Sequence, residues 1–130
     1  MRLNQRFLRQ RIMRAHRKLP AFVLADELVI QIYQLTQKFP KDEIYGLTSQ
    51  LRRAAVSVPS NIVEGCTREG EVEYLRFLEI SFGSLRELHY QLSLAQRLGY
   101  CDPTLFLLCD SKSEETEKVL AALIRSIRQG

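Results

Sequence analysis

The spacing of apolar residues constrains this chain most, because nearly all of it follows the helical repeat. Between residues 24 and 39, apolar side chains recur three or four positions apart, which places them on one side of a helix; they are Leu24, Leu28, Ile32, Leu35 and Phe39. No stretch alternates as a surface strand does, and no hairpin dipeptide occurs. The sequence therefore predicts an all-α fold.

Three further segments repeat this spacing. The second stripe is Leu47, Leu51, Ala54, Val58 and Ile62. The third runs from about residue 69 to 98, close to a heptad pattern, with Leu75, Leu78, Phe82, Leu85, Leu88, Leu92 and Ala95. The fourth starts near residue 102 and ends with Leu120, Leu123, Ile124 and Ile127.

Proline, glycine and a capping aspartate mark the expected helix boundaries. Pro40 ends the first helix, because the residue before a proline is pushed out of the α region. Gly65 and Gly99 are the expected stops of the second and third helices. Asp102 caps the fourth, with Pro103 at its first helical position.

Two segments are expected to be irregular. Pro59 lies inside the second apolar stripe and lacks a backbone donor, so it is predicted to kink or split that helix. The polar segment 110–118 in the fourth helix is expected to fray or to contain a turn.

Four helices joined by a few residues predict an up-down antiparallel four-helix bundle over residues 19–130. Residues 1–18 form a basic N-terminal extension, and one apolar side predicts a further amphipathic helix there, with Leu3, Phe7, Ile12, Ala15 and Leu19. The chain has 130 residues, which is enough for one domain with its own core.

Charge is concentrated in that extension. The chain has a net charge of +4, with 19 basic and 15 acidic residues. The extension holds seven of the basic residues and no acidic one, so residues 19–130 carry −3; the seven are Arg2, Arg6, Arg9, Arg11, Arg14, Arg17 and Lys18. Such a segment is typical of a phosphate-binding arm. A basic amphipathic helix also suits an anionic lipid surface or an acidic protein partner.

A second set of basic residues lies on the predicted bundle. Taken singly they suit a solvated helix face, and together they are candidate phosphate contacts: Lys38, Lys41, Arg52, Arg53, Arg68 and Arg76. The chain has no Trp, RNA-recognition signature or helix-turn-helix pattern, so base-specific readout is not expected.

No catalytic or metal-binding pattern is present in the sequence. It contains no GxGxxG, P-loop, GxSxG or HExxH motif, so we expect a protein that is not an enzyme and has no cofactor. His89 lies near an apolar face, where a structural histidine is expected rather than a general base. The three cysteines match no zinc spacing and suit free thiols in a reducing compartment.

Localisation is expected to be cytoplasmic, without a membrane span. No apolar run approaches the roughly 20 residues that a spanning helix needs. A short apolar run over residues 19–25 is followed at once by Asp26 and Glu27, which argues against a signal peptide.

The third helix carries apolar residues beyond its main stripe. A helix that is apolar on more than one side needs additional cover, and small residues let another backbone approach closely. An interface between copies of the chain is therefore predicted at Tyr74, Phe77, Ser81, Gly83 and Ser84, beside Ile80, Tyr90 and Leu94. A helix buried centrally in its own bundle explains the same pattern.

The central segments together form a specific pattern: FPKDE at 39–43, YGLTSQLRRAA at 45–55, VPSNIVEG at 58–65, YLRFL at 74–78, GSL at 83–85, EL at 87–88 and LGY at 98–100. Over about residues 20–128 the chain resembles the bacterial four-helix bundle family named for proteins encoded in 23S ribosomal RNA intervening sequences. It departs from that family in its longer, more basic extension and in Cys66, where an aromatic residue is common.

The resemblance implies an antiparallel bundle that assembles as a ring-like homopentamer. One branch of the family comprises the accessory variability determinants of diversity-generating retroelements, which bind the element's reverse transcriptase and nucleic acid. Arg52, Arg53 and Arg76 match recurrent basic positions of the family. Asn61 and Glu64 match a polar pair near the Pro kink, where satisfying exposed backbone groups or linking subunits are the expected roles.

These observations lead to one hypothesis and two alternatives. The hypothesis is a homo-oligomeric, non-enzymatic accessory protein that binds RNA or DNA, most concretely beside a retroelement reverse transcriptase. The alternatives are a protein-interaction scaffold without a nucleic-acid role and a module that binds a membrane surface.

The extension gives a direct prediction. If its seven charges each neutralise a phosphate, the logarithm of the binding constant should fall against the logarithm of salt concentration with a slope near −5 to −6. Deleting residues 1–18 should flatten that slope, as measured by titration of labelled RNA at several salt concentrations. An unchanged slope after the deletion would remove the extension from the binding surface.

Overall fold

The computed structural model describes residues 14–130, which form four long helices and two short 3₁₀ turns. The helices are α2 (Pro20–Thr36), α3 (Leu47–Cys66), α4 (Glu71–Arg97) and α5 (Pro103–Gln129), and the turns are η1 (His16–Lys18) and η2 (Lys41–Glu43). No strand occurs within this range. The all-α, four-helix prediction is confirmed.

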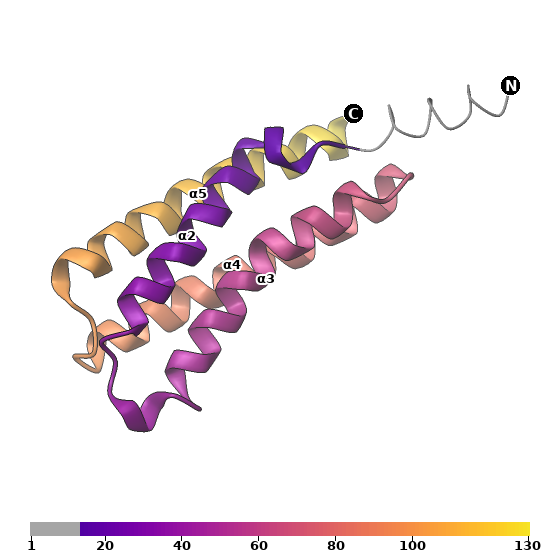
Figure 1. The fold of residues 1–130 in the computed structure, drawn as a ribbon. Coiled ribbons are helices and arrows are strands. Elements are labelled where there is room, and N and C mark those ends of the chain that lie inside the picture. The colour runs from indigo at the N-terminus through magenta and orange to yellow at the C-terminus, as the bar shows by residue number, and fades with distance from the viewer. Residues whose placement is uncertain (1–13) are drawn as a thin grey trace, which may run out of the picture.

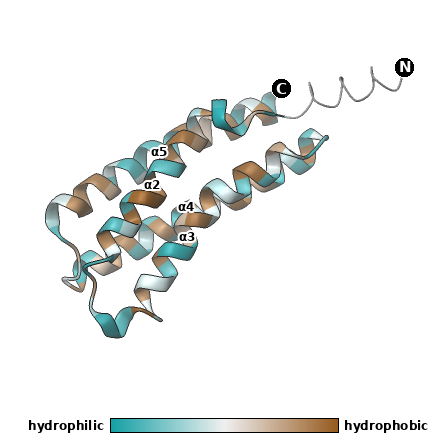
Figure 2. Cartoon of the chain, in the orientation of Figure 1, coloured by the Kyte–Doolittle hydropathy of each residue, from teal (hydrophilic) through white to brown (hydrophobic). Residues whose placement is uncertain are grey.

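The helices pack in a closed order. Each helix packs against its neighbour in sequence, and α2 also packs against α5. Figure 1 shows that the chain direction reverses at each connection, so the start of α2 and the end of α5 lie at one end of the bundle. Hydrophobic residues recur along every helix (Figure 2). One core therefore forms along the middle of the bundle.

The predicted apolar stripes supply most of this core. Their fully buried members, with under 2% of the side chain exposed, include Leu28, Ile32, Leu35, Leu51, Val58, Ile62, Leu78, Leu85, Leu88, Leu92 and Leu120. Others, such as Leu24, Leu75 and Phe82, are only partly buried. Burial of each large aliphatic side chain contributes about 1.5–3 kcal/mol, so this interior accounts for the fold.

The α4–α5 connection forms as its sequence predicts. Gly99 has φ of +80°, the left-handed conformation that favours glycine. Its N–H donates to the Gln96 carbonyl at 2.9 Å, and the next N–H, of Tyr100, donates to the Ala95 carbonyl at 3.1 Å. These two bonds define a Schellman motif. The Asp102 carboxylate then accepts from the Leu105 N–H at 3.0 Å and caps α5.

The prediction that Gly65 ends the second helix is wrong. Helix α3 continues to Cys66, and Gly65 is buried inside it. A Cβ at this position would lie 2.9 Å from the Phe77 Cβ and 3.3 Å from a ring carbon of Tyr74. The absence of a side chain therefore lets α4 approach α3 closely, and Gly65 is a packing residue rather than a stop.

Pro59 lies within α3 without splitting it. The helix stays continuous, and side chains donate to carbonyls just before the proline. The Ser81 hydroxyl of α4 donates to the Val58 carbonyl at 2.7 Å, and the Asn61 amide donates to the Ser57 carbonyl at 2.8 Å. The expected kink stays a prediction, whereas a split helix is excluded.

The prediction of a frayed segment at 110–118 is also wrong, because α5 is unbroken from Pro103 to Gln129. Ser113 and Thr116 are buried, and their hydroxyls donate to the Cys109 and Lys112 carbonyls at 2.8 and 2.6 Å. Since these polar groups are satisfied within the helix itself, they pack in the interior without ending it.

Two glycine-to-alanine substitutions test this packing. Gly65→Ala should destabilise the fold by about 1–2 kcal/mol, because overpacking against Phe77 outweighs the gain in helix propensity. The matched control Gly83→Ala should stabilise it by about 0.5–1 kcal/mol, since Gly83 is exposed within α4 with open space around it. Urea unfolding measures both. Equal effects would contradict the close α3–α4 contact.

Candidate nucleic-acid interface

A groove runs between α2 and α3 next to their connection. It consists of two adjoining hollows of about 540 and 250 Å³. Thirteen residues line this α2–α3 groove: Tyr33, Thr36, Gln37, Phe39, Pro40, Lys41, Ile44, Thr48, Ser49, Arg52, Arg53, Val56 and Ser57. Three of them are cationic and none is acidic. The groove therefore suits an anion.

Arg52 is held in one orientation by neutral partners. Its Nε–H donates to the Thr36 Oγ1 at 2.8 Å, and the Thr36 hydroxyl in turn donates to the Ile32 carbonyl at 2.7 Å. The guanidinium carbon lies 4.6 Å from the centre of the Tyr33 ring. Within residues 14–130, the two terminal nitrogens of Arg52 form no hydrogen bond or ion pair. The outer edge of this half-buried guanidinium is therefore available to a ligand.

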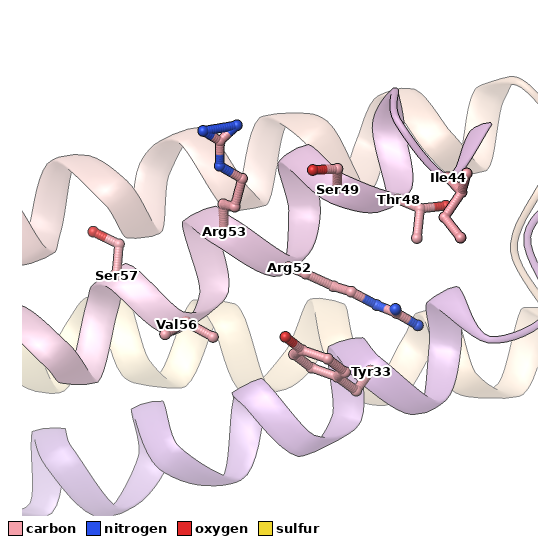
Figure 3. A pocket seen from close by; sticks show the side chains of 8 residues that line it. All are labelled: Tyr33, Ile44, Thr48, Ser49, Arg52, Arg53, Val56 and Ser57. Carbon is pink, nitrogen blue, oxygen red and sulfur yellow. The ribbon is translucent and has the colours of Figure 1, made fainter.

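The other predicted cations near the groove are more exposed. Figure 3 shows that Arg52 extends toward α2 and Tyr33, whereas Arg53 extends from α3 in a different direction. Lys38 and Lys41 are exposed at the α2–α3 connection. In the described part of the chain, none of these three forms an ion pair. The structure thus brings Lys38, Lys41, Arg52 and Arg53 together at one end of the bundle.

Arg14, the first described residue of the basic extension, binds the opposite end of the bundle. Its backbone N–H donates to the Cys66 carbonyl at 3.3 Å, and its guanidinium donates to the Arg68 carbonyl at 2.8 Å. The same guanidinium lies 3.9 Å from the centre of the Tyr74 ring. Arg14 therefore satisfies carbonyls at the C-terminal end of α3, and its guanidinium already has partners within the chain.

Arg68 and Arg76 lie at this second end but have acidic partners. Their guanidinium carbons lie 4.7 and 5.6 Å from the centre of the Phe77 ring. Arg68 pairs with Glu64 at 2.9 Å, and Arg76 pairs with Glu73 at 3.4 Å. Such exposed pairs add little stability. This end of the bundle therefore carries mixed charge, unlike the α2–α3 groove.

The predicted basic residues thus fall into two groups rather than one patch. About 14 helical residues separate Arg52 from Cys66 along α3, a rise of roughly 21 Å. Arg17 and Lys18 are exposed in η1, which packs against α2 and α3. Arg2, Arg6, Arg9 and Arg11 lie outside the described residues, as does most of the amphipathic helix predicted for the extension.

The predicted oligomer interface is corrected at two positions. Tyr74 and Ser81 are buried inside a single chain, so their side chains are not available to a second copy. Ser84 shares a 2.8 Å hydrogen bond with Ser57 of α3. The small residues of α4 therefore bring α3 of the same chain close, which is the alternative explanation of the pattern. Phe77 is half-buried and Gly83 is exposed.

Exposed apolar side chains nevertheless remain on the outer side of α4. Val72, Ile80 and Tyr90 are among the exposed large hydrophobic residues of the described chain. Ile80 and Tyr90 belong to the second apolar signal noted in the sequence, and Val72 extends it toward the start of the helix. The predicted interface between copies of the chain is therefore expected on this outer side of α4.

Asn61 and Glu64, the polar pair near Pro59, bond to different partners. The Asn61 amide donates to the carbonyl and the hydroxyl of Ser57, at 2.8 and 3.0 Å. Glu64 instead pairs with Arg68. Asn61 therefore bonds within α3 close to the proline, to the carbonyl and hydroxyl of Ser57, and its amide needs no contact with a residue of another subunit.

His89 connects α4 to α5 through two carboxylates. Its Nε2 lies 2.8 Å from Asp110, and its Nδ1 is hydrogen-bonded to Glu117, which also pairs with Arg86 at 2.5 Å. Burial by itself lowers the pKa of His89, but hydrogen bonds to both carboxylates and their charges outweigh burial, so its pKa is raised above 6.5. Both ring nitrogens are engaged, as expected for a structural histidine.

The cysteines have no partner of the kind that a metal site requires. All three are free thiols. Burial raises their pKa values, that of Cys101 to about 11 and that of Cys109 to about 12, so these thiols stay protonated at neutral pH. Among residues 14–130, no group of three or more His, Cys, Asp or Glu side chains is placed to hold a metal ion.

Sequence and structure comparisons agree on one kind of relative. The sequence pattern of the 23S rRNA-intervening sequence protein family matches residues 17–122. A crystal structure from Bacteroides thetaiotaomicron VPI-5482, described as a protein of unknown function from the S23 ribosomal protein family, superposes with a TM-score of 0.74. It is 21% identical, and the match covers 80% of this chain and 97% of that one. Such a likeness shows the fold alone.

Two further findings concern curated relatives and membrane-spanning helices. No curated protein matches the sequence. Among the helices within residues 14–130, none combines the length and the hydrophobicity needed to cross a membrane.

The His89 bridge predicts a pH dependence of stability. Because the folded pKa of His89 is raised, its contribution is complete below the unfolded value of about 6.5 and is lost as pH rises through the folded value. The free energy of unfolding should therefore fall between pH 6 and pH 8.5 by more in the wild-type protein than in His89→Gln. Urea unfolding at both pH values measures this. The control His16→Gln should keep the wild-type difference, and an unchanged difference in His89→Gln would exclude the bridge as its source.

Proposed function

The chain belongs to the family of 23S rRNA-intervening sequence proteins, and we propose that it is a non-enzymatic, homo-oligomeric accessory protein that binds nucleic acid. Its most concrete form is a protein that supports the reverse transcriptase of a diversity-generating retroelement by binding the enzyme and its template RNA. The partners are then RNA or DNA, further copies of the chain and the reverse transcriptase.

The observation that carries this proposal is the unneutralised positive charge of the α2–α3 groove. Arg52, Arg53 and Lys41 line it without any carboxylate. Of the six other arginines between residues 68 and 128, four form ion pairs, namely Arg68, Arg76, Arg86 and Arg128. A set of cations without acidic partners among residues 14–130 favours an external polyanion, and nucleic acid is the polyanion with regularly spaced phosphates.

The basic extension supports the same function through its charge. Its first described residue, Arg14, binds carbonyls at the C-terminal end of α3, and Arg17 and Lys18 are exposed in η1. One chain therefore offers two basic regions, of which the described residues, 14–18 and the α2–α3 groove, lie at opposite ends of the helices. A ring of five copies would repeat both regions five times, and linked weak contacts raise avidity.

The exposed apolar residues of α4 supply the surface for protein contacts. Val72, Ile80 and Tyr90 lie on a helix whose other side already forms the core. Exposed apolar surface of this kind is typical of sites that bind a protein. It accommodates either a second copy of the chain or the reverse transcriptase.

Three measurements on the full chain test the proposal. Anisotropy titrations at low salt should show binding to RNA or DNA, liposome flotation should show no association with anionic vesicles, and light scattering should show an oligomer near five copies. Removing residues 2–13, which leaves Arg14 in place, should weaken nucleic-acid binding without abolishing it, because the α2–α3 groove remains. The absence of binding to every nucleic acid at 50 mM salt would favour the scaffold alternative, and a monomer at micromolar concentration would exclude the ring.

A further inference from the structure

The α2–α3 groove has the chemistry of a nucleotide site rather than of a general basic surface. We infer that it binds one nucleotide unit of a single-stranded nucleic acid, with Arg52 as the ligand of the phosphate and Tyr33 beside the base. This inference rests on the proposed function, because it specifies the form of nucleic acid that the bundle binds.

The geometry of Arg52 suits a phosphate. A guanidinium offers five N–H donors in a plane, and two parallel donors match two phosphate oxygens. The Nε–H is already satisfied by Thr36 at 2.8 Å, so the terminal nitrogens alone are left for a ligand. Because Thr36 itself is buried and bonded to Ile32, the guanidinium is held in place before a ligand arrives. Less rotamer entropy is then lost on binding.

A purely structural role explains this arrangement less well. A half-buried charge is costly unless a counter-charge compensates it. Arg52 has an aromatic ring and a hydroxyl as its partners in the described chain, and the groove is lined by no carboxylate. An arginine that only joined two helices would be more stable beside an acid. The missing counter-charge therefore points to an anionic ligand.

The wall beside Arg52 points to a base. Tyr33, Ile44 and Val56 line the groove with 39%, 55% and 40% of their surface exposed. An aromatic ring next to a phosphate-binding arginine is the combination that recognises unpaired nucleotides, because every base presents a π-face for stacking. The larger hollow, of about 540 Å³, falls within the range of small-ligand sites.

This combination discriminates against a duplex. In a double helix the bases are paired and stacked inside, so their faces are not available to an aromatic side chain, and the protein contacts phosphates, 2′-hydroxyls and base edges. A single strand brings a phosphate and its base to the same place. Arg53 of α3 and Lys41 at the helix connection are exposed and also line the groove, so they suit the neighbouring phosphates.

The test compares single-stranded and duplex RNA of one sequence, each titrated into the full-length protein by fluorescence anisotropy. Arg52→Lys keeps the charge but loses the two-pronged donor, so single-strand affinity should fall about tenfold while the salt slope stays the same. Tyr33→Leu should lower single-strand affinity at least fivefold through lost stacking. Duplex affinity should change less than twofold in both variants.

Two further variants separate the site from general charge and from folding. Thr36→Val removes the hydroxyl that orients Arg52 and should weaken single-strand binding severalfold, with the salt slope unchanged. Arg125→Gln is the matched control, because Arg125 is exposed on α5 without an ion pair in the described chain, and it should reduce affinity for both forms equally and slightly. Circular dichroism melting identifies any variant that is unfolded. The binding constants of the folded variants then decide whether the groove binds the single strand.

Adenosine monophosphate separates the base from the phosphate. At equal ionic strength it should displace the single strand at lower concentration than inorganic phosphate does. Equal competition by the two would overturn the assignment of Tyr33 to the base.

The outcomes distinguish this inference from the proposed function. If the wild-type protein binds RNA but Arg52→Lys lowers affinity only as slightly as Arg125→Gln does, the assignment of a nucleotide site to the groove is wrong. The proposed nucleic-acid-binding function is then unaffected. Equal losses for single strand and duplex overturn the single-strand assignment. A changed oligomer mass in Arg52→Lys with unchanged RNA binding would assign the groove to a contact between copies. If no form of RNA or DNA binds at low salt, both proposals fail.

Discussion

The close approach of α3 and α4 is the constraint on which the rest of the structure depends. Gly65 leaves room for Phe77 and Tyr74, and hydroxyl groups bond across the same seam from Ser81 to Val58 and between Ser84 and Ser57. This contact places the C-terminal end of α3 against the start of α4. It therefore creates both the aromatic surface on which Arg14 lies and the fixed orientation of α3 that presents Arg52 toward α2.

The helical repeat predicted the core because burial follows the period directly. Every position named on the four stripes is buried or partly buried, and the turn at Gly99 follows from a local backbone preference. The first helix ends at Thr36, three residues before the predicted stop at Phe39. The errors at Gly65 and on α4 share one cause. Periodicity shows which side of a helix is apolar or small, but not which element covers it, so Gly65 was predicted as a stop, and Tyr74 and Ser81 as a surface.

The candidate site was predictable by residue type but not by grouping. The basic residues could be named from the sequence, since a cation without a nearby acid is visible there. The pairs of Arg68 with Glu64 and of Arg76 with Glu73 are local, four and three residues apart. The ring and the hydroxyl that hold Arg52 lie on α2, and this contact between two helices is not visible in the sequence. Thr36 and Tyr33 gave no sequence signal of their own, because a threonine or tyrosine near a helix end has many ordinary roles.

Arg52 belongs to α3, yet it is held by two residues of α2, and this has a thermodynamic consequence. A ligand bonded to that guanidinium needs the two helices at their present separation, because the Thr36 and Tyr33 contacts fix the donor. Occupancy of the groove and the integrity of the α2–α3 pair are therefore linked equilibria, in which each favours the other. The connection at residues 37–46 joins the two helices, so its stability and the affinity of the groove for such a ligand are coupled.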